Sequence, residues 1–242
     1  MSIEIRQSVE TMEGDGATVK RLMPVPGFMN FDPFVLWDHF EIGPDAGFPD
    51  HPHRGFEAIT YMFQGEMQHK DNLGNESIVH TGGAQRFTAG SGLVHSEMPG
   101  SSGHSTGIQL WINLPLRLKN TTPGYQQVDA ESFPELKLDK GLLKTIVGEG
   151  SPLKLLTPIR YLDVHLNNSG NCNIDVPAGF RGFIYVVEGN ATVNNNNIKQ
   201  ADGCFFSEIT TLEICGLPDI HFMLCMGQPH GEPIRQRGPY VD

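Results

Sequence analysis

Two alternating pairs of metal-binding side chains mark the first half of the chain. One proline separates His51 from His53, and one serine separates His95 from Glu97. Because side chains at positions i and i+2 of a strand point to the same face of a sheet, each pair offers two ligand atoms to one side. If the two strands face each other across a small barrel, the four donors converge on one point. Three imidazoles and a carboxylate suit a redox-capable divalent ion such as iron, copper or nickel, and also zinc or manganese.

A second carboxylate competes for the same role. Counting by twos from His51 along a continuous strand places His53, Gly55 and Glu57 on one face. Spacing therefore leaves Glu57 and Glu97 as alternative ligands, and the one that does not bind the metal becomes a supporting group or a base near a bound substrate. The remaining histidines have no second histidine at i+2, and we interpret them as structural or surface residues. They are His39, His69, His80, His104, His165, His221 and His230.

The elements that position these residues are predicted to be strands. Glycines gather just before the second pair, at Gly90 and Gly92, where they permit a sharp turn that directs the following strand into a barrel. The segment 70–75, Lys-Asp-Asn-Leu-Gly-Asn, is typical of a hairpin turn. Other segments are short, aromatic and β-branched, and are bounded by Gly, Pro or Asn. These predicted strands are residues 34–41, 56–63, 107–114, 142–147, 161–166 and 183–187.

The chain divides by pattern into two similar halves. We expect a first domain over residues 1–115, a polar, proline-interrupted linker over 116–139 and a second domain over 140–242. The strand–glycine–strand pattern around Tyr61 and Gly65 repeats around Tyr185 and Gly189. Aligning Tyr61 with Tyr185 places Asp175 and Pro177 at the positions of the first ligand pair, and aligning Gly83 with Gly203 places Cys215 and Leu217 near those of the second pair. The pattern predicts an all-β protein of two tandem barrels, of which the first holds the metal ligands.

Composition limits the classes of partner. The chain has 242 residues, 38% of them hydrophobic and 19% charged, which is typical of a folded globular protein. Its formal charge of -11 argues against a general affinity for nucleic acid or anionic membranes. The N-terminus lacks the pattern of a secretory signal, and no apolar run is long enough for a membrane span. The four cysteines show no C-x-x-C spacing, so we expect reduced thiols in a cytoplasmic protein, or a nuclear one if the source is eukaryotic.

The sequence around the ligand pairs resembles the pirin family. The resemblance rests on Phe48-Pro-Asp-His-Pro-His-Arg-Gly-Phe-Glu57, on His69-Lys-Asp71 and on Thr88-Ala-Gly-Ser-Gly-Leu-Val-His-Ser-Glu-Met-Pro99. It continues to Gly231-Glu-Pro-Ile-Arg-Gln-Arg-Gly-Pro239 and so covers nearly the whole chain. Pirins are two-domain members of the cupin superfamily, so the resemblance implies a bicupin with one metal ion, typically Fe(II), in the N-terminal barrel. The ligands it implies are His51, His53, His95 and Glu97.

The same resemblance implies two classes of function. The first is enzymatic: cleavage of a flavonol such as quercetin by O₂, for which a planar substrate needs an apolar slot at the barrel mouth. Candidate residues for that slot are Phe28, Phe31, Phe48 and Met98. The second class is a metal- or redox-gated module that binds a protein partner, such as a transcription factor or a metabolic enzyme. Because fold and metal do not fix function, both classes stay open at this point.

Overall fold

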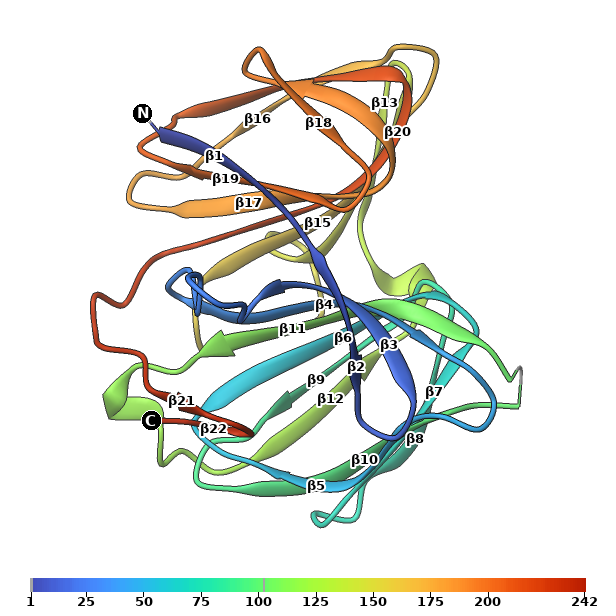
Figure 1. The fold of residues 1–242 in the computed structure, drawn as a ribbon, viewed down its shortest axis with the longest axis vertical. Coiled ribbons are helices and arrows are strands. Elements are labelled where there is room, and N and C mark those ends of the chain that lie inside the picture. The colour runs from blue at the N-terminus through green and yellow to red at the C-terminus, as the bar shows by residue number, and fades with distance from the viewer. Residues whose placement is uncertain (1, 102) are drawn as a thin grey trace. The chain divides into compact units, whose positions relative to one another are not determined.

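The computed structural model describes residues 2–101 and 103–242, which are built almost wholly of β-strands (Figure 1). The only helices over these residues are two 3-10 turns, Leu116–Leu118 and Ala130–Ser132. None of the helices in this part of the chain is long and apolar enough to cross a membrane. The chain forms two compact units. The first unit contains Val9–Ser132 and His230–Asp242, and the second contains Phe133–Pro229 and the segment that ends at Ser8.

Three antiparallel sheets make up the first unit. The largest has the strand order β12-β9-β6-β11-β4-β3-β2, and a smaller one has the order β5-β10-β7-β8. The strands of the larger sheet are β2 (Val9–Glu13), β3 (Ala17–Met23), β4 (Phe34–Ile42), β6 (Phe56–Gln64), β9 (Ala84–Thr88), β11 (Ser105–Asn113) and β12 (Gly124–Val128). Those of the smaller sheet are β5 (Phe48–His53), β7 (Glu66–Asp71), β8 (Glu76–His80) and β10 (Leu93–Pro99). The C-terminal hairpin is β21 (Gln236–Arg237) and β22 (Tyr240–Val241).

The second unit is one antiparallel sheet with the path β1-β19-β17-β20-β15-β14-β13, in which β16 also pairs with β20 and β18 with β17. Its first strands in chain order are β1 (Ser2–Gln7), β13 (Glu135–Leu138), β14 (Gly141–Val147), β15 (Ile159–Leu166) and β16 (Asn171–Asp175). They are followed by β17 (Arg181–Val193), β18 (Asn196–Lys199), β19 (Asp202–Ser207) and β20 (Thr211–Gly227). Alternate residues of these strands, such as Leu162 and Val164 with Ile184 and Leu224, form its apolar core.

Each unit therefore takes in a segment from the far end of the chain. Strand β1 pairs along its whole length with β19, and the tail that contains β21 and β22 belongs to the first unit. The expected domain ranges had placed both segments with their neighbours in sequence. Residues 124–128, inside the expected linker, form β12 and pair with β9. Backbone hydrogen bonding decides these assignments, because an edge strand joins whichever sheet offers unpaired N–H and C=O groups.

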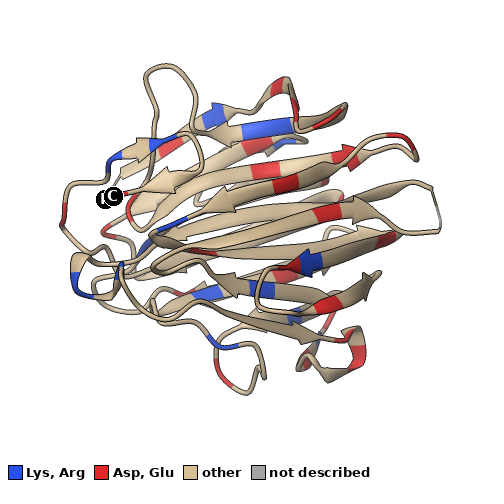
Figure 2. Cartoon of the chain, turned by 90° about the horizontal axis from the view of Figure 1, so that it is seen from below, with Lys and Arg blue, Asp and Glu red and all other residues tan. Residues whose placement is uncertain are grey.

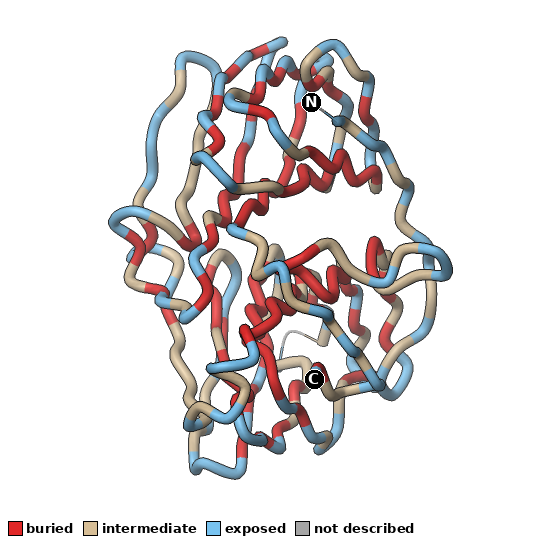
Figure 3. Tube along the Cα trace, turned by 90° about the vertical axis from the view of Figure 1, so that its left-hand side faces the viewer, coloured by how far each residue is buried: buried red, intermediate tan, exposed pale blue. Residues whose placement is uncertain are grey.

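The strand pattern of the sequence is otherwise reproduced. The all-β architecture is confirmed, and the segments 34–41 and 56–63 are β4 and β6 to within one residue. The predicted hairpin turn lies between β7 and β8. Strands β4 and β6 are mostly buried, whereas β1 and β2 are exposed or half-buried. Figure 3 shows the buried and exposed stretches along the chain. Lys and Arg residues are interspersed with Asp and Glu residues along the strands (Figure 2).

Candidate metal centre

The two predicted ligand pairs lie on neighbouring strands. β5 and β10 are hydrogen-bonded antiparallel partners, and His51 stands directly opposite His95. The expectation that the two strands face each other across a barrel is therefore wrong. The ligand side chains come together because β5 and β10 pair side by side within one sheet. Such opposed residues have Cβ atoms about 4.5–5.5 Å apart, close enough for two imidazoles to share one ion. A register shift between His95 and Glu97 brings Glu97 opposite Phe48.

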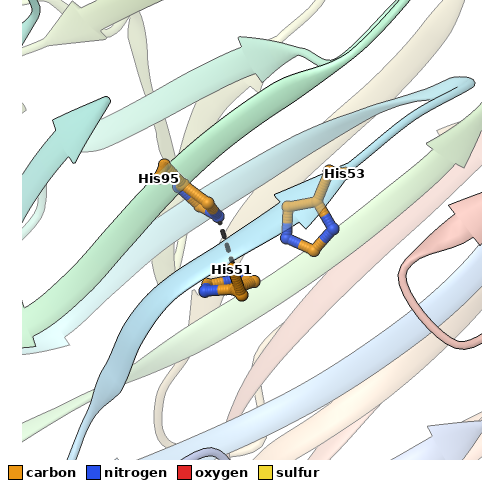
Figure 4. A group of neighbouring side chains, drawn as sticks. All are labelled: His51, His53 and His95. Carbon is orange, nitrogen blue, oxygen red and sulfur yellow. Dashed lines mark hydrogen bonds between the residues drawn. The ribbon is translucent and has the colours of Figure 1, made fainter. Parts of the chain in front are cut away.

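Three imidazoles meet at this point of the sheet (Figure 4). One ring nitrogen from each of His51, His53 and His95 lies within 4.8 Å of the others. The side chains are held firmly, since His53 is 2% and His95 0% exposed, while His51 is half-buried and borders solvent. The ring of His53 stacks on Phe87 at an interplanar angle of 10°. Packing therefore fixes the rings in one arrangement before any ion binds.

Hydrogen bonds to the outer nitrogens fix the tautomers of two of these rings. Nδ1 of His51 lies 2.7 Å from the carbonyl oxygen of Pro49, and Nδ1 of His53 lies 3.3 Å from that of Pro239. Because a carbonyl oxygen can only accept, each Nδ1 carries the proton and each Nε2 keeps its lone pair.

The third ring, that of His95, is set by a pair of residues that the sequence analysis did not select. Nδ1 of His95 lies 3.4 Å from Nδ1 of His69, and Nε2 of His69 lies 3.1 Å from the Asp71 carboxylate. Asp71 accepts from His69 Nε2–H, so His69 Nδ1 is an acceptor and His95 Nδ1 must donate to it. The lone pair of His95 is then on Nε2, as in the other two histidines.

Two of these lone-pair nitrogens are brought together. Nε2 of His51 and Nε2 of His95 are 3.1 Å apart. Two acceptors at this distance repel each other unless a proton or a cation lies between them. The donor set therefore fits a divalent ion with imidazole ligands, and the oriented outer nitrogens are the usual support of such ligands.

The protonation state of the rings agrees with this role. Burial, together with the neighbouring His95 and His51, lowers the pKa of His53 to about 3. Burial also lowers the pKa of His95 well below its ordinary value. Both rings are thus neutral at physiological pH, which is the form of imidazole that binds metals.

Glu97 lies on the same face of β10 as His95 and is 2% exposed. Its Oε1 accepts hydrogen bonds from Thr60 Oγ1 at 2.6 Å and Gln85 Nε2 at 2.6 Å, and its Oε2 accepts one from Gln109 Nε2 at 2.8 Å. A carboxylate has about four lone-pair positions, so one on Oε2 is left for a further partner. Glu97 also borders the cavity that His51 and His53 line.

The Glu57 side chain points to the face of β6 opposite the face that carries Ala58 and Thr60. It is fully buried and accepts a hydrogen bond of 2.9 Å from Thr88, its cross-strand neighbour. Thr60 and Ala58 alternate with it and point toward Glu97 and the core around His53. The count by twos from His51 fails because Gly55, with φ +85°, separates β5 from β6, and the two strands belong to different sheets. The structure does not bring Glu57 to the histidines.

A cavity of about 610 Å³ opens beside the histidines, entirely within the first unit. This volume is in the range of small-molecule sites. Apolar residues form much of its wall, and a partly buried ion pair between Arg21 and Asp38 forms a polar part. The apolar lining residues include Met29, Leu36, Phe40, Phe48, Met67 and Trp111. Of the four residues expected in a substrate slot, Phe48 lines the cavity, whereas Phe28, Phe31 and Met98 are not among its wall residues.

The C-terminal hairpin supplies one wall of this cavity through Gln236, Gly238 and Pro239. It is held by buried Val241, whose carbonyl oxygen accepts a hydrogen bond of 2.8 Å from Lys119 Nζ. The Arg54 side chain lies over the Tyr240 ring and pairs with Asp242. These tail residues were not selected from the sequence, because nothing local links them to His53.

Comparison with known proteins gives consistent matches along both units. The family model described as Pirin matches residues 16–112, and that described as Pirin C-terminal cupin domain matches residues 161–242. A pirin-like protein of Arabidopsis thaliana is 38% identical over 95% of this chain and 80% of its own length.

Two solved structures bear on the site. A quercetin 2,3-dioxygenase from Acinetobacter baumannii superposes with a TM-score of 0.92 at 30% identity, over 98% of this chain and 90% of that one. A bacterial pirin from Escherichia coli, in complex with nickel(II), superposes with a TM-score of 0.78 at 26% identity, over 94% of this chain and 99% of that one.

Proposed function

The chain belongs to the pirin family of bicupins, and we propose that it is a metal-dependent dioxygenase that cleaves a flavonol such as quercetin with O₂. The observation that carries the proposal is the convergence of His51, His53 and His95, of which His51 and His53 line a largely apolar cavity. The similarity to a protein described as quercetin 2,3-dioxygenase supports the choice of substrate class.

The metal site of this proposal consists of the three histidines and Glu97. We propose Fe(II) as the ion, because three imidazoles and one carboxylate suit a redox-capable divalent metal. When bound, the ion would supply Lewis acidity toward a substrate hydroxyl and the redox chemistry that O₂ requires. Thr60, Gln85 and Gln109 would hold the Glu97 carboxylate in place while one oxygen lone pair turns to the ion.

The chain's own residues would bind and orient the substrate. A planar aromatic molecule would lie between apolar wall residues such as Phe40, Phe48 and Trp111, and water would be excluded from the reacting end. Glu97 borders the cavity and its Oε2 has acceptor capacity left, so it would bind the ion or take the proton of the substrate hydroxyl. The polar corner at Arg21 and Asp38 would accept a hydroxyl-bearing end of the substrate.

The test is oxygen consumption by metal-reconstituted protein. Metal-stripped chain is loaded anaerobically with Fe(II), and separately with Ni(II), Mn(II), Cu(II) or Zn(II), and each form is mixed with a panel of flavonols. We expect O₂ uptake with at least one flavonol in the iron form. His53→Ala and Glu97→Gln should abolish turnover, and His104→Ala, a change at an exposed histidine away from the site, should leave it unchanged.

Absence of turnover with every flavonol and every metal would overturn the enzymatic proposal. In that case the better proposal would be that the chain is a redox-gated module, which binds a protein partner in only one oxidation state of its iron. A pull-down that compares Fe(II) and Fe(III) forms distinguishes this outcome from simple inactivity.

A further inference from the structure

A second group of metal-binding side chains lies in the second unit, on strands β15 and β20. Asp163 and His165 occupy positions i and i+2 of β15, and His165 stands directly opposite His221 of β20. Residues that alternate with them, Leu162, Val164 and Leu166, belong to the apolar core. The three polar side chains therefore share the opposite face of the sheet, and strand pairing holds them together.

The donor atoms of this group are close to one another. One ligand atom from each of the three residues lies within 4.8 Å of the others. Nε2 of His221 is 2.7 Å and Nε2 of His165 is 3.3 Å from the same oxygen, Oδ1 of Asp163. The two imidazole rings are stacked, with centroids 3.9 Å apart and an interplanar angle of 15°. Because zinc ligands lie about 2.0–2.2 Å from the ion, side-chain shifts on the order of an ångström would let all three donors bind it.

We propose that Asp163, His165 and His221 form a second binding site, for a borderline divalent ion such as Zn(II), Ni(II) or Co(II). Two imidazoles and one carboxylate are a donor set that such ions prefer. The ion would take the lone pair of each Nε2, with the ring protons on the Nδ1 atoms, and the carboxylate would change from hydrogen-bond acceptor to ligand.

Charge and exposure support an ion at this place. Asp163 is 7% exposed, and a buried carboxylate gains from a compensating cation. His165 and His221 both face Oδ1 of this carboxylate, at 3.3 Å and 2.7 Å. Lys144 of β14 is the cross-strand neighbour of Asp163. Its ammonium group lies 3.2 Å from the Glu135 carboxylate and so pairs with that residue. The His165 side chain is 46% exposed, which gives an ion access and leaves room for water ligands.

This group does not include the positions of the second unit that the internal repeat relates to the first ligand pair. Asp175, the counterpart of His51, is exposed and accepts a hydrogen bond of 3.3 Å from Thr211. The proposed site is thus not a remnant of the first one. It also stands apart from the dioxygenase proposal, because it requires neither the first metal nor substrate.

The test is metal stoichiometry in the full-length chain. Zn(II) is titrated calorimetrically into metal-stripped wild type, His95→Ala, His221→Gln and the double variant. We expect two equivalents in wild type, one in each single variant and none in the double variant. Co(II) titration gives an independent readout, since ligation by the group adds a visible absorption band that His221→Gln removes.

The His221→Gln variant separates a metal ligand from a structural hydrogen-bonding residue, because it introduces a glutamine side chain. Its amide can still donate to Asp163, so a purely structural clasp survives while an imidazole ligand is lost. His104→Gln is the matched control, an exposed histidine of the first unit that should change nothing. Circular dichroism and thermal unfolding verify the fold of each variant. Unchanged stoichiometry in folded His221→Gln protein would overturn the proposal and leave the group as a hydrogen-bonded clasp.

Discussion

The carbonyl oxygen of Pro239 lies 3.3 Å from Nδ1 of His53. A residue near the C-terminus therefore fixes the tautomer of a histidine in the first barrel, and the hairpin that carries Pro239 also closes one side of the cavity. Groups that orient metal-binding histidines in this way commonly change metal affinity by about 10–100-fold. The docking of the tail thus affects the candidate metal site.

Loosening the tail should weaken metal binding. Val241 is 0% exposed and packs in the core that contains Phe56 and Trp111. Val241→Ala removes two buried carbon atoms, so we expect about 1.5 kcal/mol lower stability and roughly tenfold weaker metal binding. Chelator competition measures the affinity. Asp242→Asn weakens a solvent-exposed pair with Arg54 and leaves the buried Val241 side chain in place, so it should lower the affinity less than Val241→Ala does. Equal affinities in the wild type and Val241→Ala would contradict a role for the tail.

The Asp71–His69–His95 chain should tune the same site. Asp71→Asn keeps an acceptor for the turn formed by Leu73 and Asn75, but offers His69 an amide donor instead of a carboxylate. The tautomer of His69 then reverses, and His95 loses the acceptor that keeps its proton on Nδ1. We expect a loss of metal affinity of about 10–100-fold, with a changed ligand-field spectrum of the Co(II) form.

The control for this variant is Glu76→Gln on the adjoining strand β8. It removes the same charge from an exposed side chain paired only loosely with Lys70, at 3.9 Å. If both variants weakened metal binding equally, net charge rather than the hydrogen-bonded chain would be the cause.

The two buried glutamates should differ in their effect on the metal. Glu97→Gln removes the carboxylate beside the cavity, so we expect the metal content of purified protein to fall sharply. Glu57→Gln changes a residue that faces Thr88 on the other side of β6, so the metal content should stay at one ion in the first unit. Elemental analysis of both variants decides the matter. The reverse result would exchange the roles assigned to the two carboxylates.

A pH effect is expected at Lys119, which anchors the tail. Burial lowers the pKa of this lysine from 10.5 to about 8, while Asp242 and Glu232 oppose the shift. Between these values the unfolded chain binds more protons than the folded one, so stability rises with pH. The stability contribution of Lys119 is thus fully present above pH 10.5 and is lost as pH falls toward 8.

Comparison with a variant isolates this contribution. The difference in unfolding free energy between wild type and Lys119→Met should shift in favour of wild type from pH 8 to pH 10.5, in urea denaturation series at matched ionic strength. A difference that is constant over this range would show that Lys119 does not titrate there.

The features of the site that depend on local spacing could be predicted from the chain alone. The spacing of His51 and His53, and of His95 and Glu97, fixed each pair to one strand face, and the glycines at 90 and 92 marked the turn between β9 and β10. The same spacing is present in His69-Lys70-Asp71 and in Asp163-Val164-His165. A search for alternating histidine and carboxylate pairs, rather than histidine pairs, would have selected both.

The features of the site that depend on contacts between distant segments became apparent only in the folded structure. Alternation predicts a face only within an unbroken strand, so it failed for Glu57, where Gly55 and a change of sheet intervene. Pairing of β5 with β10, rather than opposition across a barrel, placed His51 against His95. The Pro239 carbonyl reaches His53 because the tail returns to the first unit, and hydrogen bonding between residues so far apart in sequence depends on the folded backbone rather than on any spacing along the chain.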